Sequence, residues 1–174
     1  MIRKAVLGDI PAVSDIYEKI HDKEEKHSAS IGWIRGVYPT EKTALASLER
    51  GDLFVFEEDG KVLASAIINK AQVDVYADGD WAFEAPDEKI MVLHTLTVSP
   101  DEGKRGIGRK FVEFYEHYAF ENGCTVLRMD TNEINSVARS FYKKLGYRES
   151  GIVLCVFNGI PNVKLVLLEK KVSE

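Results

Sequence analysis

The sequence is poor in the residues that metal sites and disulfide frameworks need. It has two cysteines, Cys124 and Cys155, with no CxxC pair and no Cys/His cluster at zinc-binding spacing. We therefore expect two reduced thiols on strands and no bound metal. No apolar run approaches the ~18 residues that a membrane span requires. The first ten residues lack a long apolar stretch, so we expect no signal peptide and a soluble, cytoplasmic protein without a membrane partner.

Positive charge is also scarce. Lys and Arg total 23 against 28 Asp and Glu, and the formal net charge of −5 argues against a nucleic-acid partner. Apolar residues make up 45% of the 174 positions, as in ordinary globular proteins, and the length predicts one domain over residues 1–174. Residues 71–90, hereafter the acidic segment, hold six acidic side chains against Lys89. The segment therefore carries the equivalent of the whole net negative charge.

The spacing of apolar residues and turn signals predicts an α/β domain of the α+β type. We expect a mostly antiparallel mixed sheet of about seven strands with flanking helices and one right-handed parallel crossover between the fourth and fifth strands. The first part of the acidic segment could extend the third strand, and its second part is predicted to be a loop. The strands are expected at 2–6, 53–57, 62–68, 90–98, 124–129, 147–157 and 163–170, and the helices at 9–26, 40–51, 108–121 and 135–145.

The densest functional signal is the run DEGKRGIGRK at residues 101–110, between a predicted strand and a predicted helix. Gly106 and Gly108 allow a tight turn and a close approach of a ligand to the backbone. The first amides of a helix have no intrahelical acceptor and favour an anion. Four cations surround them: Lys104, Arg105, Arg109 and Lys110. The run indicates a pyrophosphate site; the alternative is an ordinary strand-to-helix loop with solvated lysines.

Two other phosphate-binding patterns fit less well. The P-loop string GxxxxGK[ST] does not occur. The dinucleotide fingerprint GxGxxG appears only in inverted glycine order, although Asp130 lies about 20 residues further on, like the acid that binds a ribose in that fold. The Pro100-Asp101-Glu102 spacer and the lack of a second βαβ unit also disfavour a dinucleotide site.

The sequence resembles the GCN5-related N-acetyltransferase (GNAT) family. Gly106-Ile107-Gly108 matches the second half of that family's [Q/R]-x-x-G-x-[G/A] signature, while Gly103 stands where Gln or Arg is usual. Residues 93–100 (LHTLTVSP) and 127–151 resemble the family's fourth strand and its fifth strand, fourth helix and sixth strand. The resemblance implies a single GNAT domain that uses acetyl-CoA, with a homodimer through the C-terminal hairpin as an option.

The resemblance also implies roles for residues that bind the cofactor. The pyrophosphate would lie against Gly103, Lys104, Arg105, Gly106, Ile107, Gly108 and Arg109, and the backbone of Leu96, Thr97 and Val98 would pair with the pantetheine arm. Asn135 would contact the cofactor, or would serve as a helix N-cap. Tyr142 would also contact the cofactor and protonate the departing thiolate; its alternative is a core tyrosine.

The attacking amine must lose a proton. His94, on the fourth strand, is the first candidate for the base because its usual pKa of ~6.5 suits the task. On strict alternation it shares a face with Leu96 and Val98 unless a bulge intervenes. Alternatively, His94 is a core histidine without a catalytic role. The base would then be an Asp or Glu of the acidic segment that acts through a water molecule. His21, His27 and His117 are predicted to be exposed.

For the acceptor, the aromatic and acidic side chains Trp33, Tyr38, Asp74, Tyr76 and Trp81 predict a pocket that attracts a cationic amine. The alternative is a solvated acidic edge of the sheet. The resulting function is an acetyl-CoA-dependent N-acetyltransferase that acetylates a primary amine of a small molecule or peptide by direct attack in a ternary complex. A non-catalytic acyl-CoA-binding or sensing module on the same fold is the alternative, because Gly103 replaces the usual Gln or Arg.

Overall fold

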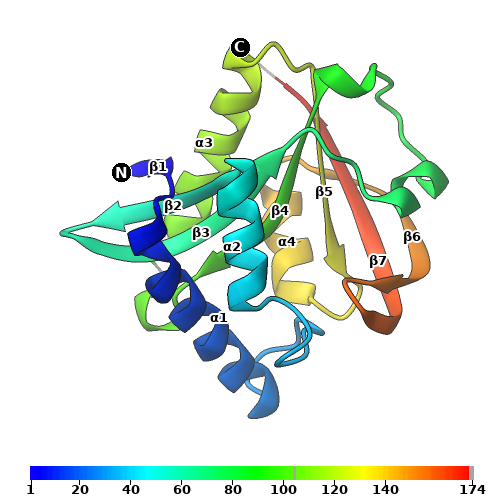
Figure 1. Ribbon diagram of the computed structural model, residues 1–174. Helices are drawn as coiled ribbons and strands as arrows, with labels where there is room; N and C mark the ends of the chain where they lie inside the picture. Colours follow the sequence, from blue (N-terminus) through cyan, green and yellow to red (C-terminus); the bar gives the residue numbers. More distant parts are fainter. Residues whose placement is uncertain (104, 173–174) are drawn as a thin grey trace. The chain divides into compact units, whose positions relative to one another are not determined.

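A computed structural model describes residues 1–103 and 105–172 of the chain. Over these residues it forms a mixed seven-stranded sheet with the order β1-β2-β3-β4-β5-β7-β6, which confirms the predicted fold class (Figure 1). The strands are β1 (Ile2–Lys4), β2 (Leu53–Glu58), β3 (Lys61–Asn69), β4 (Ile90–Val98), β5 (Val126–Asn132), β6 (Arg148–Phe157) and β7 (Ile160–Lys171). The α-helices are α1 (Ile10–Glu25), α2 (Glu41–Arg50), α3 (Ile107–Glu121) and α4 (Ser136–Lys144).

Strands β4 and β5 form the predicted parallel pair. Their register runs from Ile90 opposite Val126 to Leu93 opposite Met129, and α3 lies between the two strands in the chain. All four β4 residues of this stretch are buried, as expected for a strand that is covered on both faces. The pairs β1–β2, β2–β3, β5–β7 and β6–β7 are antiparallel, so the sheet is mostly antiparallel as predicted.

Within the described residues, no helix is both long and apolar enough to span a membrane.

The chain divides into two compact units, each with its own packing. The first unit comprises Met1–Ala29, Trp33–Ile68 and His94–Tyr115, and the second comprises Ser30–Gly32, Asn69–Leu93 and Glu116–Glu174.

In the first unit, α1 packs its apolar face on the β2–β3 hairpin. Val13 and Tyr17 lie four positions apart on α1 and join Leu53, Val55 and Ile67 in one buried cluster. This spacing places the two helix residues on one face, as the helical period predicts. Burial of this apolar surface stabilises the unit by roughly 1.5–3 kcal/mol for each large side chain.

The helix ends of the first unit follow the sequence signals with one difference. Thr40 is the N-cap of α2, and Gly51 ends that helix at a left-handed φ of 74°. Asp9 precedes α1 as predicted, but its carboxylate accepts two hydrogen bonds from the Arg3 guanidinium, at 2.7 and 3.0 Å. This guanidinium holds the pKa of Asp9 below its usual value.

In the second unit, β5, β7 and β6 lie side by side (Figure 1). Strand β7 is buried from Leu165 to Leu168, and the next residue, Glu169, is also fully buried. A carboxylate at such a position needs hydrogen-bond donors, because an unpaired buried charge is very costly. Two of its four donors come from the acidic segment and two from β6, as described below.

Two local expectations were wrong. Residues 74–78 do not extend β3 but form a 3-10 helix, Asp74–Asp78. The turn carries Tyr76 into the interior, where its ring is 2% exposed, and this burial outweighs the alternating pattern. His21 is 1% exposed rather than solvated, and its Nε2 lies 2.9 Å from the Pro39 carbonyl oxygen. His27 and His117 are exposed as predicted.

Candidate active site

The glycine-rich loop lies in the first unit and leads into α3. Gly106 adopts a φ of 71°, a left-handed conformation that favours glycine, and Ile107 begins α3 as a buried residue. Apart from its two chain neighbours, an added Cβ at Gly106 would have no atom of the described residues within 4 Å. The backbone is therefore open to a ligand at the start of a 15-residue helix, whose first amides favour an anion.

The positive charge of the loop is more engaged than the sequence suggested. Arg105 forms ion pairs with both Glu58 and Glu102, so two carboxylates already face its guanidinium. Arg109 and Lys110 are exposed, and the Lys110 ammonium lies 5.7 Å from the centre of the Phe56 ring. The prediction for Lys104 concerns a residue outside the described part of the chain.

The second half of β4 is irregular at Thr95. This β-branched residue has a φ of 49°, which is rare for its type and interrupts the alternation of the strand. Its hydroxyl forms a hydrogen bond with the Tyr38 hydroxyl, and Tyr38 packs edge-on against Trp33 with 6.1 Å between ring centres. The structure thus brings two of the predicted acceptor residues to β4.

The predicted pantetheine-binding residues follow Thr95. Thr97 is 1% exposed, and its hydroxyl lies 2.8 Å from the Ser65 hydroxyl on β3. Leu96 and Val98 are half-buried, as is His94. The Thr97 side chain is therefore used to attach β4 to β3, and a role of this residue in ligand binding falls to its backbone.

The second unit holds the predicted general acid. Tyr142 lies on α4, is 8% exposed and packs against Phe141 and Tyr147. Burial raises the pKa of its hydroxyl well above 10, and the charge of Asp130 acts in the same direction. Asn135 is the N-cap of α4, with its Oδ1 accepting from the Ala138 amide at 3.0 Å, which confirms the capping interpretation.

Asp130, near the end of β5, has a polar environment that the sequence did not indicate. Its Oδ2 accepts a hydrogen bond of 2.7 Å from the buried Tyr76 hydroxyl. Burial raises the pKa of Asp130 to about 6, while the Tyr76 hydrogen bond acts to lower it. The Asp130 charge also contributes to the raised pKa of Cys155 on β6.

The acidic segment is fastened to the sheet through its own interior groups. The Glu169 carboxylate accepts the Ala82 amide at 2.7 Å, the Phe83 amide at 3.1 Å, the Ser150 hydroxyl at 2.8 Å and Arg148 at 2.5 Å. Four donors around one buried carboxylate offset much of its desolvation cost. The exposed Asp80 joins this attachment, because its carbonyl oxygen accepts from Arg148 at 3.0 Å and its carboxylate lies 3.7 Å from the same guanidinium.

Arg128 on β5 makes a second attachment. Its guanidinium lies 4.0 Å from the centre of the Trp81 ring and donates to the Gln72 side chain and the Phe83 carbonyl. Trp81 in turn donates its ring N–H to the Tyr76 carbonyl at 2.6 Å. One face of the predicted cation-binding tryptophan is therefore already covered by a cation of the protein itself.

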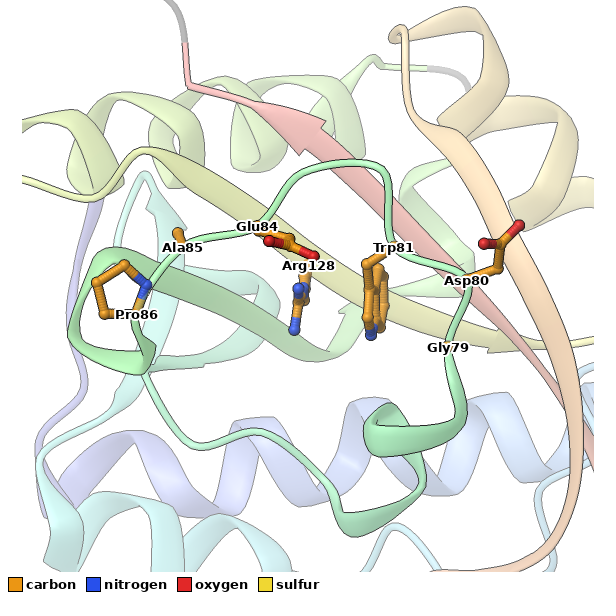
Figure 2. Close-up of a pocket in the computed structure, with 7 residues that line it drawn as sticks. All are labelled: Gly79, Asp80, Trp81, Glu84, Ala85, Pro86 and Arg128. Carbon is orange, nitrogen blue, oxygen red and sulfur yellow. The ribbon is translucent and has the colours of Figure 1, made fainter.

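A cavity of about 650 Å³ lies within the second unit, bounded by residues 79–81, 84–86 and Arg128. Figure 2 shows the backbone of the segment arching around the Arg128 side chain, with Trp81 beside it. Gly79 lines the cavity, and a Cβ at this position would come within 2.5 Å of the Trp81 ring nitrogen, so the tryptophan needs glycine there.

Sequence reasoning missed three charged residues in this unit: Arg128, Asp130 and Glu169. Each lies within or at the end of an apolar run that forms a strand. A charged residue in such a run is rarely buried without partners, so its position could have predicted a buried and paired charge. Among residues 1–103 and 105–172, no group of three or more His, Cys, Asp and Glu could hold a metal ion.

The comparison with protein families identifies the class of this protein. The acetyltransferase (GNAT) family matches residues 13–147, which is well over half of the chain. The chain therefore belongs to the acetyltransferase (GNAT) family, and the predicted family membership is confirmed.

Individual relatives agree with this assignment. The uncharacterized N-acetyltransferase MJ1207 of Methanocaldococcus jannaschii is 24% identical over 153 residues, which cover 87% of this chain and 62% of the relative. This chain thus spans less than two thirds of that relative's length. A GNAT-family acetyltransferase from Streptococcus agalactiae has a TM-score of 0.82 at 21% identity, covering 100% of this chain and 95% of its own. YncA from Salmonella typhimurium, solved with its cofactor acetyl-CoA, has a TM-score of 0.69 at 18% identity over 100% and 94% of the two chains.

Proposed function

We propose that this chain is an acetyl-CoA-dependent N-acetyltransferase that transfers the acetyl group directly to a primary amine of a small molecule or peptide. The family match carries the class of reaction. The observation that carries catalysis is the hydroxyl of Tyr142, which is buried against Phe141 and Tyr147 and, like any tyrosine, is protonated at neutral pH. Because the family match runs through both compact units, we also propose that residues 1–174 act as one acetyltransferase domain.

The glycine loop fits the pyrophosphate of coenzyme A. Gly106 leaves open space above a left-handed backbone, and the N-terminus of α3 favours the negative charge. We assign pyrophosphate binding to the backbone of Gly103 and Gly106–Gly108, assisted by the exposed Arg109. Arg105 contributes less than a free arginine would, since Glu58 and Glu102 already pair with it.

When bound, acetyl-CoA supplies a thioester whose carbonyl carbon is attacked by the acceptor amine. Tyr142 donates its proton to the sulfur as the carbon–sulfur bond breaks, because a thiolate leaves more readily when a neighbouring O–H stabilises it. The backbone of Leu96, Thr97 and Val98 orients the pantetheine arm by strand-like pairing. The Oδ1 atom of Asn135 is used in the N-cap, so Asn135 would contact the cofactor through its side-chain NH2 group.

For the acceptor, we propose a cationic amine that is recognised by Trp33, Tyr38 and the acidic segment with Asp74, Tyr76 and Trp81. The exposed position of Asp74, and of Asp80 and Glu84 at the cavity, supports attraction of a cation. Tyr76 and Trp81 support the site mainly through their ring contact, at 5.4 Å between centres, because the protein's own groups occupy much of their surface.

A homodimer through the C-terminal hairpin also remains our proposal. Ile152, Leu154 and Val156 alternate along the edge strand β6 and are 47%, 68% and 70% exposed. An exposed apolar edge of this kind is suited to contact with a second copy of the chain.

The test is thiol release from acetyl-CoA with a panel of amines. We expect release with at least one amine, and we expect Tyr142→Phe to lower kcat about 100-fold without changing the affinity for CoA. Tyr118→Phe, a half-buried tyrosine on α3, is the matched control and should retain the wild-type rate. An unchanged kcat of Tyr142→Phe at every pH would contradict the general-acid role. CoA binding without thiol release from any amine would instead favour an acyl-CoA-binding module, and no CoA binding would contradict both.

A further inference from the structure

We propose that Asp130 is the catalytic base that takes the proton from the acceptor amine, and that Tyr76 positions its carboxylate. This inference rests on the proposed acetyl transfer and names a residue for the step that the sequence left open between His94 and an acid of the acidic segment. The base would come from the core strand β5, and the acidic segment would contribute a tyrosine rather than an acid.

The geometry of β5 supports this assignment. Asp130 comes directly after the residue pairs that join β4 and β5, of which the last is Leu93 with Met129. As a whole residue Asp130 is half-buried, unlike the fully buried Glu169. The Tyr76 hydroxyl binds one of its two oxygens at 2.7 Å and fixes the carboxylate in one orientation.

The neighbouring groups give Asp130 and Tyr142 opposite proton-transfer roles. Around Asp130 the titratable groups are Tyr76 from the acidic segment, Tyr142 from α4 and Cys155 from β6. Burial raises the pKa of Asp130 to about 6, so the carboxylate is still ionised at pH 7 and is a stronger base than an ordinary aspartate. The pKa of Tyr142 is raised further above its usual 10. At a pH between these two pKa values, Asp130 is ionised and can accept a proton, while Tyr142 is protonated and can donate one. This is the arrangement that general acid–base catalysis needs.

The proton and electron movements balance without another reactant. Asp130 accepts a proton from the acceptor's ammonium group, and the freed nitrogen lone pair forms the new carbon–nitrogen bond. The electrons of the carbon–sulfur bond move to sulfur, which receives the proton of Tyr142. The acylated nitrogen then loses its second proton to the Tyr142 phenolate, which restores the tyrosine, and Asp130 releases the first proton to water.

Tyr76 gives a readout that a merely structural role would not produce. A hydrogen bond from a hydroxyl stabilises the ionised carboxylate and lowers its pKa. Removal of that hydroxyl should therefore raise the pKa of Asp130 and move any activity that depends on it to higher pH. The loss of a structural contact alone would lower stability without moving a pH profile.

The experiment is the pH profile of kcat/KM for an amine that the wild-type enzyme acetylates. The wild-type profile should show two transitions. Activity should fall below about pH 6 as Asp130 is protonated, which is the acidic limb, and a second transition should lie near the higher pKa of the amine. Asp130→Asn should lower kcat/KM at least ~100-fold at pH 7.5 and remove the acidic limb. Tyr76→Phe should move that limb upward by about one pH unit and keep most of the rate at pH 8.5.

Three controls separate the possible outcomes. Glu49→Gln, an exposed carboxylate on α2 outside the acidic segment, should leave the profile unchanged. CoA affinity of each variant, measured by calorimetry, reports whether it folds; if Asp130→Asn fails to fold, the direction of the Tyr76→Phe shift decides. An acidic limb that persists in Asp130→Asn and disappears in His94→Gln would overturn the proposal in favour of His94. A wild type that acetylates no amine would instead contradict the proposed function itself.

Discussion

The glycine-rich loop and the acidic segment are both rich in charged residues, but they differ in which of their groups are exposed and which are buried. In the loop, the groups proposed to bind the ligand are backbone atoms, and Gly106 takes a left-handed φ of 71° with open space above it as far as the described residues extend. In the acidic segment, the groups that matter lie inside, where Tyr76 is 2% exposed and the Ala82 and Phe83 amides bind Glu169. Local conformation thus defines the first region, and long-range partners define the second.

This difference changes the meaning of charge in each region. Arg105 in the loop is paired with Glu58 and Glu102, so the proposed anion site would depend more on helix and backbone dipoles than on the number of cations. In the acidic segment, Arg128 of the protein covers one face of Trp81. Among the exposed acids, Asp80 lies 3.7 Å from Arg148 and Asp87 accepts a hydrogen bond from Gln72 at 2.6 Å, and salt screens charges at such exposed positions.

The largest effect should come from removal of the carboxylate that holds the acidic segment. Glu169→Ala leaves Arg148, Ser150 and two backbone amides without their acceptor, and we expect the free energy of unfolding to fall by about 3–5 kcal/mol. Urea unfolding measures this loss. The control is Glu84→Ala in the same segment, which is exposed and should change stability by less than about 0.5 kcal/mol. Equal effects of the two substitutions would show that the segment does not depend on its interior attachment.

A smaller effect is expected at the glycine loop. Gly106→Val places a β-branched side chain at a left-handed φ and over the open backbone, so CoA should bind about 10–100-fold more weakly, equivalent to one charge-assisted hydrogen bond. Isothermal titration calorimetry with CoA measures the change. Gly60→Val in the β2–β3 turn is the matched control, because Gly60 also has a left-handed φ, of 73°, and an added Cβ there would also meet open space among the described residues. If Gly106→Val binds CoA as tightly as Gly60→Val and the wild type, the loop is not the pyrophosphate site.

The smallest effect concerns the exposed acids. A cationic amine should be preferred to an acidic one, and replacement of Asp80 and Glu84 by Asn and Gln should raise KM for the cation only about two- to fivefold, since these groups are exposed and screened. The preference should weaken as salt concentration rises. Steady-state kinetics at low and high salt measures it. Equal turnover of acidic and basic acceptors by the wild type would contradict an acceptor site selected by charge.

Much of the fold was predictable because its signals are local. The parallel β4–β5 pair follows from the apolar run before Ser99-Pro100, and the end of α2 follows from Gly51. Asn135 was predicted as an N-cap from its residue type and position, and the structure confirms this. These assignments depend on neighbours within a few residues, so the chain itself contains what is needed.

The errors come from residues whose partners lie far along the chain. His21 is buried because the Pro39 carbonyl lies against it, and residues 74–78 form a turn because Tyr76 reaches Asp130, 54 positions away. The local pattern around His21 contains no information about Pro39. The alternation of side chains within the acidic segment likewise contains none about Asp130. The same reason explains why Asp130 was considered only as an imitation of a ribose-binding acid.

The sequence by itself determined the element order and the family, since each follows from local spacing, residue type and short motifs. The tertiary structure alone decided how the acidic segment is used. It placed Glu169 beneath two backbone amides, covered Trp81 with Arg128 and brought the Tyr76 hydroxyl to Asp130. The physical reason is that burial and hydrogen bonding between distant residues set the charge state and orientation of a side chain, and neither can be read from its position in the chain.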